Sequence, residues 1–163
     1  MKKRWIALYV ENDIGVLAKI TGLCAGKNYN LDSLTVGITE DPTVSRMTIG
    51  LSSDDNTFEQ IKKQMNRCIE VIKVIDLTKG SIYAKEILFI KLLNCTKEEI
   101  EEGFRIASVF GTAVVDYGID SMLMECVQTE AKNNDIIKLI KDKFKNVKIV
   151  RGGSVAIDSI SLN

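Results

Sequence analysis

Two successive stretches of the chain show the same order of strand and helix patterns, and this repeated order restricts the fold more than any other feature. Apolar or alternating runs predict strands, and apolar residues three or four positions apart predict helices with one buried face. The first stretch has a strand, a helix, two strands, a helix and a strand, at residues 5–10, 16–24, 30–39, 44–51, 58–65 and 68–77. After a break at 78–81, the same order returns at residues 82–93, 97–108, 112–117, 122–128, 134–144 and 147–151.

This order predicts an α+β protein built from two ferredoxin-like βαββαβ units, each an antiparallel sheet with both helices on one face. We place the boundary between the units so that they comprise residues 1–79 and 80–163. The strand at 5–10 is apolar on both faces, although helices cover only one face of each predicted sheet. Units of about 80 residues bury a modest share of their surface, so we predict at least a homodimer, formed through the first unit.

The junction between the first strand and the first helix has features of an anion-binding site. The first N–H groups of a helix lack intrahelical partners and carry the positive end of the helix dipole, so they attract a carboxylate. Gly15 has no Cβ and lets a ligand approach the backbone, while Asn12 offers both a donor and an acceptor to a free amino acid. The alternative is that Asn12 or Asp13 only caps the helix and Gly15 only makes the turn. The local pattern is compatible with both interpretations.

The residue types that are missing from the chain exclude several classes of catalytic site. There is no histidine, so a histidine general base is excluded, and a zinc or copper site would need an unusual ligand set. The cysteines stand far apart, without a C-x-x-C pair, at positions 24, 68, 95 and 126. We interpret them as small buried apolar side chains. We therefore expect neither a catalytic residue nor a metal site in this chain.

Charge and hydropathy give no indication of a nucleic-acid or membrane partner. Lysine and arginine total 22, as do aspartate and glutamate, and the longest run of like charge is Lys2-Lys3-Arg4. The apolar run behind this basic start ends at Glu11 with no small-residue cleavage site, and no run is long enough to cross a bilayer. We therefore expect a cytoplasmic protein.

Three motifs in the first half occur together in a pattern that is typical of one family. They are E-N-x-x-G-x-L-x-K-I at residues 11–20, N-Y-N-L-D-S-L-T-V at residues 28–36 and D-P-T-V-S-R-M-T-I at residues 41–49. The first two are similar to those of ACT domains, a fold used widely to sense amino acids, and the third is more specific. Over residues 4–80 the chain resembles the small, regulatory subunit of acetolactate synthase, also called acetohydroxyacid synthase. The chain length and the second unit match the family's bacterial form.

The resemblance implies a non-catalytic subunit that binds the large catalytic subunit of acetolactate synthase, raises its activity and confers feedback inhibition by valine in branched-chain amino acid biosynthesis. It implies that valine, or another branched-chain amino acid, binds at the interface between two ACT domains of a homodimer. The matching positions are Asn12, Ile14, Gly15, Val16 and Leu17 of one chain with Asn30 and Leu31 of the other. Thiamine diphosphate, magnesium and FAD are expected on the catalytic subunit, and no cofactor on this chain.

The second half departs further from the family pattern. Phe110-Gly111 stands where the family commonly has Phe-Arg, and the tail at 158–163 lacks the usual closing Arg-Gly, although Arg151-Gly152-Gly153 keeps an Arg-x-Gly. Because this half is tied in the family to contact with the catalytic subunit and to the valine response, both properties can differ here. In the first half, we expect Arg46 to face outward and to pair with a neighbour or a partner subunit, with an anion contact as the alternative.

Two other classes of function are compatible with the predicted fold. One is a stand-alone ACT-type amino-acid sensor that acts on a different partner. The other is an enzyme or RNA-binding module, because this fold hosts many activities. The second class is disfavoured, since the chain has no nucleophile constellation, no phosphate-binding loop and no strand with the aromatic signature of sheet-based RNA binders.

Overall fold

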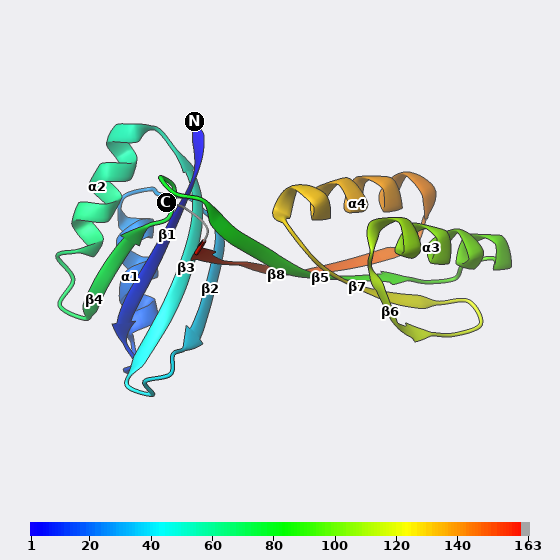
Figure 1. The fold of residues 1–163 in the computed structure, drawn as a ribbon, viewed down its shortest axis with the longest axis horizontal. Helices are drawn as coiled ribbons and strands as arrows, with labels where there is room; N and C mark the ends of the chain where they lie inside the picture. The colour runs from blue at the N-terminus through cyan, green and yellow to red at the C-terminus, as the bar shows by residue number, and fades with distance from the viewer. Residues whose placement is uncertain (161–163) are drawn as a thin grey trace. The chain divides into compact units, whose positions relative to one another are not determined.

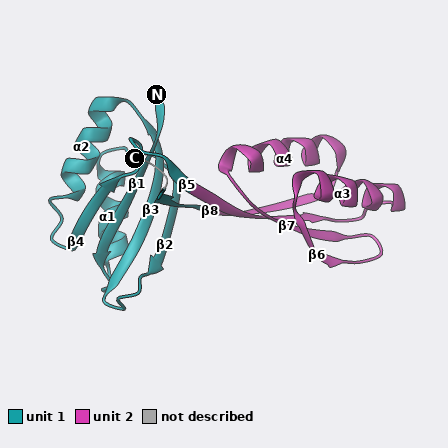
Figure 2. Cartoon of the chain, viewed as in Figure 1, with its two compact units in different colours: residues 1–83, 154–163 teal, residues 84–153 magenta. Residues whose placement is uncertain are grey.

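Two compact units make up the structure, a computed structural model in which residues 1–160 are described. Unit 1 consists of residues 1–83 and the C-terminal segment from residue 154, and unit 2 of residues 84–153 (Figure 2). We predicted a single boundary after residue 79 and did not predict that the C-terminal segment returns to unit 1. The division of the chain into two domains stays a prediction. Within the described residues, no helix is long and apolar enough to span a membrane.

Unit 1 is a four-stranded sheet with two helices on one face (Figure 1). Its elements are β1 (Lys2–Glu11), α1 (Val16–Gly26), β2 (Leu31–Ile38), β3 (Val44–Ser53), α2 (Asp55–Met65) and β4 (Val71–Asp76). The strands lie in the order β2-β3-β1-β4, and β1 pairs antiparallel with both of its neighbours. The βαββαβ order and the single helical layer confirm the predicted ferredoxin-like fold.

The core of unit 1 follows from the two periodicities of its elements. Each helix buries residues spaced three or four apart, and β1 and β3 bury alternate residues beneath them. The cluster comprises Val16, Ile20 and Cys24 of α1, Phe58, Ile61 and Met65 of α2, Ile6, Leu8 and Val10 of β1, and Met47, Ile49 and Leu51 of β3. This packing holds the start of α1 against the end of β1.

Unit 2 repeats the arrangement. Its elements are β5 (Ile82–Leu92), α3 (Lys97–Phe110), β6 (Ala113–Tyr117), β7 (Met122–Gln128), α4 (Glu130–Lys143) and β8 (Val147–Asp158), with strands in the order β6-β7-β5-β8. Helix α4 begins at Glu130 and not at residue 134, because the Thr129 hydroxyl caps it by accepting from the Lys132 N–H at 3.4 Å. Strand β8 continues to Asp158, whereas the sequence pattern predicted an end at residue 151.

The end of β8 covers part of the helix-free face of the unit 1 sheet. The Ser154 N–H donates to the Ser33 hydroxyl at 2.9 Å, and the Thr35 hydroxyl donates to the Ser154 carbonyl at 3.1 Å. Beneath this segment, Ala7 and Thr48 lie opposite each other on β1 and β3 and are both buried. Part of the surface that we expected a second copy to cover is therefore covered within the chain.

Replacement of Gly50 by alanine is expected to lower the stability of unit 1. An alanine Cβ at this position would lie 2.7 Å from Cζ3 of Trp5, whose ring packs over the glycine. Moving this ring costs about 1–3 kcal/mol, the usual range for overpacking. Chemical denaturation measures the loss, and fluorescence reports the ring directly because Trp5 is the only tryptophan. Gly37→Ala is the control, since nothing lies within 4 Å of the added Cβ; equal stability of the two variants would contradict the prediction.

Candidate functional site

The N-terminus of α1 is open, as the anion-site interpretation of this junction requires. Gly15 is the N-cap and has a left-handed backbone with φ 89°, a conformation that favours glycine, and no side chain caps the helix. A Cβ at Gly15 would meet nothing within 4 Å. Among residues 1–160, no acceptor pairs with the backbone N–H of Leu17 or Ala18. The alternative in which Asn12 or Asp13 caps this helix is therefore wrong.

Asn12 holds the loop in place through contacts with the turn between β2 and β3 and with the start of β3. Its Nδ2 donates to the Pro42 carbonyl at 2.9 Å, and its Oδ1 accepts from the Ser45 hydroxyl at 2.9 Å. Its backbone N–H donates to the Thr43 carbonyl at 2.8 Å. One amide hydrogen and one lone pair of Asn12 remain for a ligand. The pattern analysis missed Ser45, whose only sequence signal is its place in the third family motif.

A carboxylate stabilises the turn that contacts Asn12. Asp41 accepts from the Thr43 hydroxyl at 2.6 Å and from the Thr43 N–H at 2.9 Å. These two bonds, the hydroxyl first, hold the pKa of the Asp41 carboxyl below its usual value, so the group stays ionised at neutral pH. The rigid turn thereby fixes the orientation of the Asn12 amide.

The charged side chain on the first turns of α1 is already engaged. Lys19 forms an ion pair with Glu70, and this hydrogen bond raises the pKa of Lys19 and lowers the pKa of Glu70. The Glu70 carbonyl also accepts from the Glu11 N–H at 2.9 Å. Glu70 therefore also holds the start of the loop in place. Because Glu70 neutralises the charge of Lys19, the positive potential at this junction comes mainly from the backbone N–H groups of α1.

The predicted apolar contacts divide into exposed and buried side chains. Ile14 and Leu17 are exposed beside the open helix end. Val16 is buried in the core of unit 1, so only its backbone can face a ligand. Leu31 is half-buried and packs against the same core. The loop and the first turn of α1 thus present two apolar side chains beside the unpaired N–H groups of Leu17 and Ala18.

Asn30 lies at the other end of α1. The helix has 11 residues, which corresponds to about 16 Å at 1.5 Å per residue, and it separates residues 12–17 from Asn30. Asn30 instead lines a separate hollow of about 150 Å³ with Tyr29 and Ser53. Within one chain, the structure does not bring the two groups of predicted site residues together.

Comparisons with protein families assign both halves of the chain. Residues 6–73 match the AHAS small subunit-like ACT domain, and residues 85–160 match the small subunit of acetolactate synthase. The loop at 11–17 and the strand start at 30–31 both lie in the first match.

Individual relatives agree along nearly the whole chain. The acetolactate synthase small subunit of Aquifex aeolicus is 38% identical over 157 residues, which is 96% of this chain and 81% of that protein. The isozyme 3 small subunit of Escherichia coli is 31% identical over 95% of this chain and 94% of its own length. The crystal structure of the Thermotoga maritima small subunit superposes with a TM-score of 0.87 at 28% identity, covering 99% of this chain and 100% of that one. The chain therefore belongs to the acetolactate synthase small subunit family.

Proposed function

We propose that this protein is the regulatory subunit that activates the catalytic subunit of acetolactate synthase and makes it sensitive to feedback inhibition by valine. The observation that carries the proposal is the open start of α1, where Gly15 leaves space for a ligand beside unpaired N–H groups. Membership of the small subunit family supplies the partner, because the name of these relatives implies a larger subunit. The chain itself is non-catalytic in this proposal and acts in the cytoplasm.

The contacts around the loop suggest how a branched-chain amino acid binds. The N–H groups of Leu17 and Ala18 point along the helix axis toward its N-terminus and donate hydrogen bonds to the ligand carboxylate. The remaining amide hydrogen of Asn12 adds a second donor there. Ile14 and Leu17 contact the aliphatic side chain, since both are exposed at this junction.

A second copy of the chain completes the site. The length of α1 keeps Asn30 away from the loop of its own chain, so Asn30 and Leu31 reach the ligand only from a partner in a homodimer formed through the ACT domains. A ligand that touches both chains binds one arrangement of the dimer better than another, and this difference supplies the coupling to activity. Thiamine diphosphate, magnesium and FAD belong to the catalytic subunit in this scheme, and none to this chain.

Acetolactate formation by the cognate large subunit tests the proposal. The rate is measured for the large subunit alone, with this protein, and with this protein and valine. We expect stimulation by the protein and loss of that activity with valine. Stimulation without valine inhibition would restrict the proposal to activation, and binding of an amino acid without any stimulation would favour a stand-alone sensor with another partner.

A further inference from the structure

A hollow of about 290 Å³ lies in unit 1 among residues outside the proposed valine site. Its lining includes Tyr9, Val36, Ile38, Thr39, Arg46 and Val155. Tyr9 and Arg46 are paired across β1 and β3 on the helix-free face, and Val155 comes from the segment of β8 that covers this face. The hollow shares no residue with the loop at 11–17 or with the strand start at 30–31.

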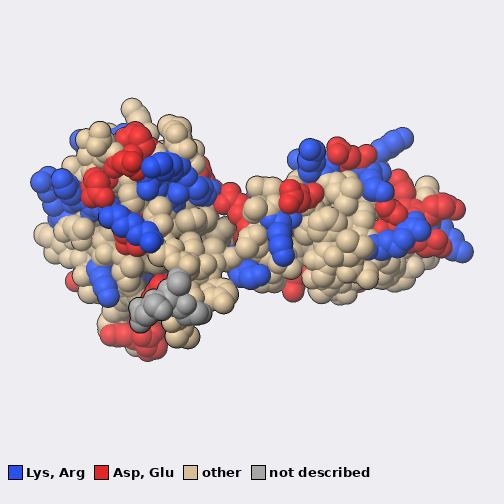
Figure 3. All heavy atoms as spheres, turned by 45° about the horizontal axis from the view of Figure 1, so that its top comes forward, with Lys and Arg blue, Asp and Glu red and all other residues tan. Residues whose placement is uncertain are grey.

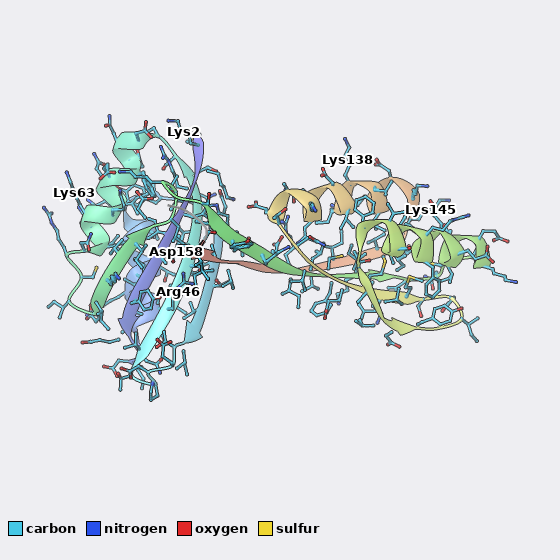
Figure 4. All side chains as sticks on the ribbon, viewed as in Figure 1. Lys2, Arg46, Lys63, Lys138, Lys145 and Asp158 are labelled. Atoms are coloured by element: carbon cyan, nitrogen blue, oxygen red, sulfur yellow. The ribbon has the colours of Figure 1, made fainter. Side chains whose placement is uncertain are left out.

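Arg46 brings to this hollow a positive charge whose hydrogen-bond partners are neutral groups, and Glu40 also lines the hollow. Its Nη1 donates to the Thr48 hydroxyl at 3.0 Å and its Nη2 to the Ala156 carbonyl at 2.6 Å, and its guanidinium lies 5.7 Å from the centre of the Tyr9 ring. Among residues 1–160, no carboxylate lies within 4.0 Å of its nitrogens. Figure 4 shows Arg46 on the sheet of unit 1. All of these partners are neutral groups of the same chain, which agrees with the expected pairing of Arg46 with a neighbour.

The geometry around this guanidinium suits a carboxylate. Two of its five N–H donors are used in the chain, and the others are left for a ligand. A half-buried arginine beside a hollow forms stronger charge-assisted hydrogen bonds than one in bulk water, because water screens it less. In the view of Figure 3, basic and acidic side chains are interspersed over the surface.

The walls of the hollow limit the remainder of the ligand. Tyr9 and Val155 present apolar surface beside Arg46. A volume of about 290 Å³ is at the lower limit for ligand sites, so it fits a molecule of about four to six carbon atoms. We propose that this hollow binds a small aliphatic carboxylate, with its charged end on Arg46 and its hydrocarbon against Tyr9 and Val155.

Titration of the full-length ¹⁵N-labelled protein with 3-methylbutanoate tests the site. We expect amide shifts at residues 35–40 and 46, and at least about tenfold weaker binding of the uncharged 3-methylbutan-1-ol, which cannot form charge-assisted bonds. L-Valine is titrated in parallel, because Glu40 also lines the hollow and suits an ammonium group. Amide shifts at residues 35–40 on addition of valine would show that the hollow binds the carboxylate of an amino acid. Amide shifts only at residues 14–18 on addition of valine would show that the hollow binds an acid without an amine. Equal binding of acid and alcohol would overturn the proposal.

Two pairs of variants separate the ligand contact from the packing of β8. Arg46→Met is expected to weaken 3-methylbutanoate at least about tenfold, whereas Ser33→Ala removes a contact to β8 and keeps the affinity within about twofold. Val155→Glu repels the acid, while Ile157→Glu on the same segment does not, although the two side chains are 56% and 57% exposed. Unchanged binding by Arg46→Met, or equal effects of the two glutamates, would refute the site even if one variant folds poorly.

Discussion

Mixing the Gly15→Asp and Asn30→His variants in equal amounts is expected to restore valine binding that each variant lacks alone. In a site split between two chains, a mixed dimer has one site with both changes and one site with neither. Half of randomly assorted dimers are mixed, so about one quarter of all sites become intact. If each site lay within one chain, every site would carry one of the two changes and none would recover.

Each variant on its own is expected to weaken valine at least about tenfold, or about 1.4 kcal/mol, without loss of activation. Gly15→Asp places a carboxylate where the ligand carboxylate binds, and a side chain at φ 89° adds strain. Gly15→Ala is the control that keeps the strain and removes the charge. Calorimetry on single variants and on the mixture gives the number of sites. Loss of stimulation together with valine binding would contradict separate regions for activation and inhibition.

Arg151→Met is expected to destabilise unit 2 strongly. Glu86 is only 4% exposed, and Arg151 donates to its two oxygens from Nε at 2.8 Å and from Nη2 at 2.7 Å. Asn133, also buried, donates to the same carboxylate at 3.1 Å. Without the guanidinium, a buried charge loses its counter-charge, which costs about 3 kcal/mol and lowers the midpoint of thermal unfolding by roughly 10–20 °C. The cost of about 3 kcal/mol is at the lower end of the range for breaking a buried ion pair, because the Arg151 side chain is 37% exposed.

Differential scanning calorimetry of the full chain measures this loss. Arg105→Met removes an exposed arginine that pairs with Glu102 on the same helix, and it is expected to cost less than about 1 kcal/mol. Adding Glu86→Gln to Arg151→Met is expected to recover part of the stability, since the buried group is then neutral. Equal midpoints for the two arginine variants would show that the Glu86 pair contributes little.

Local sequence patterns predicted the fold of each unit. Apolar periodicity located all twelve elements, because the buried face of each helix and strand is set by residues that are close in sequence. The same patterns placed the start of α4 too late. Its first turn contains the buried Asn133, which bonds to Glu86, and a polar residue gives no apolar signal. The local patterns located the loop before α1 correctly. They did not decide between an uncapped junction with a glycine and a helix capped by Asn12 or Asp13.

The sequence by itself determined the order of elements, the family and the positions of the proposed valine contacts. Only the tertiary structure decided how the polar groups of unit 1 are used. Asn12 binds Pro42 and Ser45 instead of capping α1, and Arg46 reaches the carbonyl of Ala156. These partners are 30, 33 and 110 residues away, so no local pattern predicts them. Periodicity records which face of an element is buried, whereas the partner of a polar side chain depends on which distant segment the fold places beside it.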